Sequence, residues 1–183
     1  MASEAGITFI GQWTFDRGMK AVGAGIALFG RKLEGGLAQL KSLLGGWAAI
    51  IHGSCFGVSC ALPPGTHTVR LSNSLLKGPS EWIAQTTVHE LAHVIDWHSF
   101  IQVPAGYYGW GHFSDAWSGA PLTGYAAGDE WRPYPRRWER WAEAVTVWVF
   151  GAAYKGKETE KMITPTALTA QMDRITALLN GWY

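Results

Sequence analysis

Two histidines four residues apart, His89 and His93, constrain this chain more than any other feature, because they fall inside a segment that predicts one long helix. Ser80 is a good N-cap and Glu81 places a favourable charge in the first turn, so we expect a helix over residues 81–97. Its inward face is apolar and consists of Ala84, Val88, Leu91 and Ile95. Positions i and i+4 lie on one face of a helix, so the two imidazoles point the same way. That spacing suits two ligands on one zinc ion, each at ~2 Å.

Glu90 follows His89 directly and completes the pattern His-Glu-x-x-His. Its carboxylate can reach a water on the metal without binding the metal itself, so one helical turn encodes two ligands and a general base. The alternative is a chance match, in which two helix histidines accompany a surface glutamate. The intervening residues, Leu91 and Ala92, favour helix and weaken that alternative.

A third ligand must come from elsewhere, because a catalytic zinc needs three protein ligands and one open position for water. The candidates downstream of the motif are Asp96, His98, His112, Asp115, Asp129, Glu130, Glu139 and Glu143. His98 is too close in the chain to turn back unless the helix ends at once. His112 lies in a glycine-rich segment and is a fallback ligand.

Glu139 and Glu143 are the best of these candidates, because they lie four apart on a second predicted helix, over residues 135–150. Pro135 suits the first turn of that helix. Its apolar stripe consists of Trp138, Trp141, Ala142, Val145, Trp148 and Val149. One carboxylate can bind zinc while the next turn holds a ligand histidine from behind, as ligating histidines nearly always require. The alternative is a solvated helix face on which Arg136 and Arg140 are the ion-pair partners.

The segments His89-Glu90-Leu91-Ala92-His93 and Glu139-Arg140-Trp141-Ala142-Glu143-Ala144 resemble the gluzincin metallopeptidases, most closely the catalytic domain of the anthrax lethal factor type. The resemblance covers residues 80–150 and implies a zincin-like α+β fold with a small sheet. It also implies that Glu139 is the third zinc ligand and that Glu143 supports a histidine. Asp96 matches an acidic residue that often follows the motif in this group, which implies that it too supports the metal ligands. A metzincin pattern fails, because Asp96 replaces its glycine and Ser99 stands where its third histidine should be.

The same family has a tyrosine upstream of the glutamate helix, whose hydroxyl stabilises the oxyanion. The segment Thr123-Gly124-Tyr125-Ala126 resembles that region and implies this role for Tyr125. Tyr125 lies farther from Glu139 than the family pattern has it. Tyr134 lies nearer but lacks the flanking residues, so it stays an alternative.

The rest of the chain predicts short elements around these two helices. We expect two helices over residues 16–44, a strand over 47–51, a loop over 53–65, a strand over 66–71 and a final helix over 165–179. The order of helices, small sheet and helices indicates an α+β fold. Residues 98–134 show no clear period, and we expect the loop over 101–134 to form one wall of a cleft. Their aromatic residues either bind apolar side chains of a substrate or cover the core, and they are Tyr107, Tyr108, Trp110, Phe113 and Trp117.

Length and composition set the outer limits. The 183 residues, 48% of them hydrophobic, indicate one globular domain, with an N-terminal helical part over 1–45 and a catalytic part over 46–183. The net charge of +1 gives no case for nucleic acid or an anionic membrane as partner. No signal peptide is recognisable, and residues 21–30 are too short to span a bilayer, so we expect a soluble protein without membrane insertion and leave its compartment and oligomeric state open. Cys55 and Cys60 either close a small disulfide loop or are two buried thiols.

These patterns together predict a hydrolase, a zinc-dependent metallopeptidase that acts on a peptide or protein substrate. Zinc lowers the pKa of its bound water to ~7, Glu90 takes the proton and delivers it to the leaving amine, and zinc and Tyr125 stabilise the oxyanion. The alternative is a catalytically inactive zincin-like module used for binding or structure. A structural zinc would be closed by four protein ligands, usually including Cys. The resemblance also suggests a toxin domain of a larger exported protein.

Overall fold

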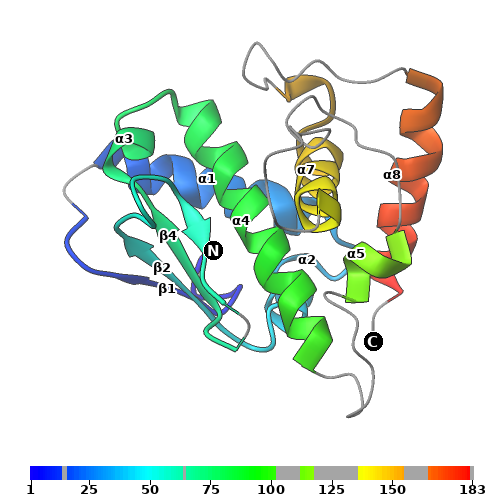
Figure 1. Ribbon diagram of the computed structural model, residues 1–183, viewed down its shortest axis with the longest axis horizontal. Helices are drawn as coiled ribbons and strands as arrows, with labels where there is room; N and C mark the ends of the chain where they lie inside the picture. The colour runs from blue at the N-terminus through cyan, green and yellow to red at the C-terminus, as the bar shows by residue number, and fades with distance from the viewer. Residues whose placement is uncertain (14–15, 64, 102–111, 118–135, 155–164, 182–183) are drawn as a thin grey trace.

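The computed structural model describes residues 1–13, 16–63, 65–101, 112–117, 136–154 and 165–181. A small mixed sheet and a set of helices make up an α+β fold, as predicted (Figure 1). In the view of Figure 1 the sheet lies on the left, α4 crosses the centre, and α7 and α8 lie on the right. None of the described helices combines the length and the apolar character needed to cross a bilayer.

The sheet has four strands in the order β1-β2-β4-β3. They are β1 (Ile7–Ile10), β2 (Ala48–His52), β3 (Cys60–Ala61) and β4 (Thr68–Leu71). β1, β2 and β4 run parallel to one another. β3 pairs with β4 in the antiparallel direction and lies at one edge of the sheet. The centre of the sheet is apolar, with Ile50 directly opposite Val69 and both side chains fully buried.

The strand β1 was not predicted, and the expected order of helices before sheet is wrong. β1 is only four residues long and alternates between buried Ile7 and exposed Thr8, a pattern too short to stand out from a turn. Glycines with positive φ flank it, Gly6 at 68° and Gly11 at 96°. The chain therefore begins with a strand, two helices and a parallel strand. The two-residue β3 also falls inside the segment predicted to be a loop.

Two helices, α1 (Asp16–Lys32) and α2 (Gly36–Leu43), connect β1 to β2 and confirm the helix pair expected over 16–44. α1 packs against the long helix α4 (Ser80–Ile101), which extends four residues beyond its predicted end. A Cβ atom at Gly25 of α1 would lie 2.7 Å from the carbonyl oxygen of Ala84 in α4. Glycine at this position therefore allows the backbones of the two helices to approach closely.

The other side of α4 packs against α7 (Arg136–Phe150), which matches the helix predicted over 135–150. The one-turn helix η1 (Gly151–Ala153) follows it, and α8 (Pro165–Asn180) matches the predicted final helix. Two short helices, α3 (Asn73–Leu76) and α5 (His112–Trp117), were not predicted.

Aromatic side chains fill the region between α4, α5 and α7. Trp141 is fully buried, stacks on Phe113 with ring centroids 5.4 Å apart, and meets Trp117 edge-on. Phe113 and Trp117 therefore cover the core, which decides the alternative left open for these two. Tyr107, Tyr108 and Trp110 lie outside the described residues. The alternative for the cysteines is also decided, because Cys55 and Cys60 form a disulfide.

Candidate metal centre

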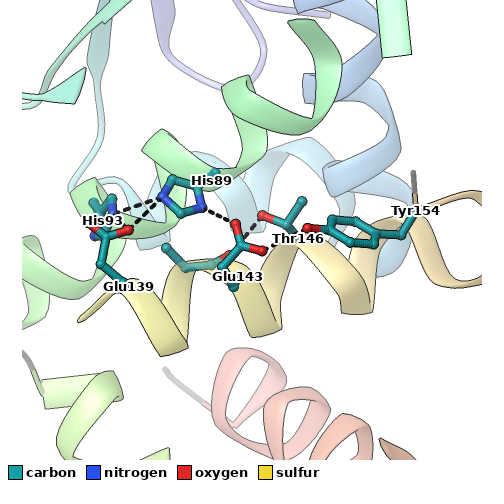
Figure 2. Close-up of polar contacts among 7 residues, drawn as sticks. His89, His93, Glu139, Glu143, Thr146 and Tyr154 are labelled. Carbon is teal, nitrogen blue, oxygen red and sulfur yellow. Dashed lines mark hydrogen bonds and ion pairs between the residues drawn. The ribbon is translucent and has the colours of Figure 1, made fainter. Parts of the chain in front are cut away.

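Helices α4 and α7 bring His89, His93 and Glu139 together (Figure 2). The Nε2 atoms of His89 and His93 are 3.2 Å apart. The Oε2 atom of Glu139 lies 3.2 Å from the first of these nitrogens and 3.7 Å from the second. Among the described residues, these three form the one group of side chains arranged to hold a metal ion.

Burial of the motif does not fit a chance match with a surface glutamate. His89, Glu90 and His93 are 8%, 7% and 6% exposed. The apolar face that the sequence predicts for α4 explains why the motif is buried, since Val88, Leu91 and Ala92 lie in the core around it. Polar groups are kept in such a place only when they are paired with one another or with a ligand.

Glu143 lies one turn after Glu139 and contacts the far side of His89. Its Oε1 atom is 2.8 Å from Nδ1 of His89, and the residue is 6% exposed, so a solvated helix face does not describe it. This contact favours a proton on Nδ1 of His89, so Nε2, which faces Glu139 and His93, is the nitrogen that can bind a metal ion.

The charges in the cluster favour a bound cation. Burial alone would lower the pKa of His89, but the hydrogen bonds and charges of Glu139 and Glu143 raise that pKa well above its ordinary value. Burial alone would raise the pKa of Glu139, but its close contacts with both histidines, and their charge, hold that pKa well below its ordinary value. A carboxylate that stays ionised beside two imidazoles attracts a proton or a metal ion.

Glu90 occupies a different environment, on the side of α4 that faces β3. Burial raises the pKa of its carboxyl group, and the neighbouring His89 and His93 partly offset this effect. The backbone of Ala61 in β3 is another group that lowers this pKa. A raised pKa brings a glutamate closer to the range in which it can both take and return a proton near neutral pH.

Asp96 and His98, further along α4, lie apart from the triad in their described contacts. Oδ1 of the fully buried Asp96 accepts a hydrogen bond from the amide of Ser114, which ties α5 to α4. The predicted support of the metal ligands by Asp96 stays a prediction. His98 lies against His67, with ring centroids 5.1 Å apart, and is no part of the triad.

Several predicted candidates cannot be placed. Outside the described residues lie Tyr125, Tyr134, Asp129 and Glu130, and the side chains of His112, Asp115 and Arg136 are not described either. The role of Tyr125 in stabilising an oxyanion therefore stays a prediction.

Sequence reasoning missed Tyr154. Its hydroxyl group donates a hydrogen bond of 2.7 Å to Oε2 of Glu143, as Figure 2 shows. Eleven residues separate the two, which in a continuous helix would put them about 16 Å apart along the axis. Their contact requires α7 to end at Phe150, and the positive φ of 52° at Gly151 accompanies that end. The one sequence signal was a glycine at a helix end, shortly before a tyrosine.

No protein family model matches the chain, and neither a curated protein nor a solved structure is found to be similar to it. The arrangement of α4 and α7 is therefore the ground on which a function can be proposed.

Proposed function

We propose that this protein is a zinc-dependent metallopeptidase with a zincin-like fold of the gluzincin type. The observation that carries the proposal is the convergence of His89, His93 and Glu139, whose ligand atoms lie 3.2, 3.2 and 3.7 Å from one another. Two imidazoles from one helix and a carboxylate from a later helix form a three-ligand set that leaves a position for water.

The spacing of these atoms fits zinc well. Ligand bonds of ~2 Å at tetrahedral angles put neighbouring ligand atoms about 3.3 Å apart. The donor set of two nitrogens and one carboxylate oxygen is also typical of catalytic zinc.

When bound, Zn²⁺ acts as a Lewis acid and lowers the pKa of a water to ~7. Glu90 is the general base: its carboxylate takes a proton from the attacking water and returns it to the leaving amine. Burial raises the pKa of this carboxyl group toward the working range. Tyr125 remains the predicted donor to the oxyanion.

An extended peptide is the substrate that the surroundings of Glu90 favour. Within the described residues, β3 pairs with β4 on one side only, so its other edge presents backbone groups beside Glu90. A peptide in extended conformation can add to such an edge by main-chain hydrogen bonds. Peptide or protein hydrolysis therefore fits this site better than hydrolysis of a small ester or phosphate.

The rival is an inactive module in which zinc joins two helices. A closed structural site usually includes thiolate ligands. Cys55 and Cys60 are joined to each other and offer no thiolate, and the described residues provide three ligands to the cluster. Both observations support an open site.

The test combines metal analysis with a peptide cleavage assay, with and without a chelator. We expect about one zinc per wild-type chain. Glu139→Ala should lose zinc, whereas Glu90→Gln should keep zinc and lose turnover by several orders of magnitude. Glu81→Gln is the matched control, since Glu81 is exposed at the start of the same helix. Zinc-loaded wild-type protein without cleavage of any peptide in a broad library would favour the inactive module.

A further inference from the structure

The contact between Tyr154 and Glu143 continues a chain of hydrogen bonds that begins at a candidate metal ligand. Nδ1 of His89 lies 2.8 Å from Oε1 of Glu143, and the other oxygen of the same carboxylate accepts the hydroxyl of Tyr154 at 2.7 Å. Both bonds are short enough to be charge-assisted. Figure 2 shows the three side chains in a row along α7, with Tyr154 at the end farthest from His93.

This row is held in a protected place. The Glu143 side chain is 8% exposed, so little water is present to replace a missing partner. A carboxylate can rotate about its last bond, and one hydrogen bond alone leaves that rotation poorly restrained. A second bond, to the opposite oxygen, fixes the plane of the carboxylate and thereby the direction from which it approaches the His89 ring.

We propose that Tyr154 is a positioning residue for the metal centre. Its hydroxyl orients Glu143, and Glu143 in turn holds the His89 ring with the proton on Nδ1 and the lone pair of Nε2 toward the ion. This inference rests on the proposed function and deepens it, because it assigns to the site a residue from beyond the helix that carries both glutamates. The partly buried ring of Tyr154 packs against the core, which places the hydroxyl independently of the metal.

The expected consequence is a weaker hold on the metal when the hydroxyl is lost. In Tyr154→Phe the ring still packs, but Oε2 of Glu143 loses a donor and the carboxylate can turn away from His89. We expect zinc affinity to fall roughly threefold to tenfold, the effect of one hydrogen bond. A slight reorientation of His89 should also change the visible absorption of the cobalt-substituted protein, which reports ligand geometry directly.

The experiment measures zinc affinity by competition with a chelator of known strength, in wild type, Tyr154→Phe and Thr146→Val. Thr146 is the matched control, since it is a buried hydroxyl on α7 that donates to the carbonyl of Ala142 and not to Glu143. Thr146→Val should bind zinc as wild type does. Thermal unfolding of each metal-free variant checks that the fold is intact.

A double-mutant cycle separates positioning from a general structural role. If Tyr154 acts through Glu143, the variant Glu143→Ala/Tyr154→Phe should bind zinc no more weakly than Glu143→Ala alone. Additive losses would overturn the proposal, as would a Tyr154→Phe variant that binds zinc like wild type or fails to fold. If wild-type protein itself does not bind zinc, the proposed function fails and this inference fails with it, so the two failures are distinguishable.

Discussion

Replacement of Glu143 by alanine is the sharpest test of how the site is built. The substitution removes the acceptor of the His89 Nδ1–H bond while leaving all three predicted ligands in place. The bond is 2.8 Å long, and the two side chains are 11% and 8% exposed. A hydrogen bond to a charged group in such a setting contributes about 1.5–3 kcal/mol. Since each 1.4 kcal/mol is about a factor of ten, zinc affinity should fall about tenfold to a hundredfold.

Chelator competition gives the affinity directly, and Glu143→Gln is the matched control. The amide of glutamine keeps an oxygen that can accept from Nδ1 but lacks the charge, so its loss should be smaller, about twofold to tenfold. The loss of zinc affinity in Glu139→Ala should exceed the losses in both Glu143 variants, because this substitution removes a ligand. The reasoning would be refuted if wild type bound zinc and Glu143→Ala bound it within threefold of wild type. In that case the His89 ring is held by its packing and not by the carboxylate behind it.

Three further predictions concern the scaffold and its charges. Gly25→Ala should lower the free energy of unfolding by about 1–3 kcal/mol, because its methyl group clashes with α4. In Gly23→Ala no atom lies within 4 Å of the added Cβ, so this control should raise the free energy of unfolding by up to about 1 kcal/mol. Denaturant titration of both variants measures these changes, and equal effects would count against the close approach of α1 to α4. Reduction of the Cys55–Cys60 disulfide should lower the free energy of unfolding by about 2 kcal/mol. It should also reduce turnover, because Cys60 belongs to β3. Unchanged turnover in reductant would show that the disulfide does not affect the site. Because the pKa of His89 is raised, the metal-free protein prefers the protonated ring, and the resulting contribution to stability is complete below the ordinary pKa of 6.5 and is lost as pH rises through the folded-state pKa. In the presence of chelator, the denaturant concentration at the unfolding midpoint should therefore fall as pH rises through this range. A midpoint that rises over the same range would contradict the assignment.

The organisation of the helices around the site could be predicted from sequence because local signals are strong there. Ser80 and Pro135 mark helix starts, and the apolar stripes of both helices repeat at helical spacing over several turns. The same signals fail for β1, which has four residues and pairs with the distant strand β2, and for β3, which has only two residues. A pattern of two to four residues does not distinguish a strand from a turn.

By itself, the sequence determined which side chains could serve together on one helix. His89 and His93 share a face by spacing alone, and Glu139 and Glu143 do so in the same way. Tertiary structure alone decided that these two faces meet, because 46 residues separate His93 from Glu139 and no local rule relates the axes of two helices so far apart. It also decided that Tyr154 turns back toward Glu143, since that contact depends on where α7 ends and how it packs. Periodicity follows from backbone geometry within a few residues, whereas the meeting of distant faces depends on how the whole core packs.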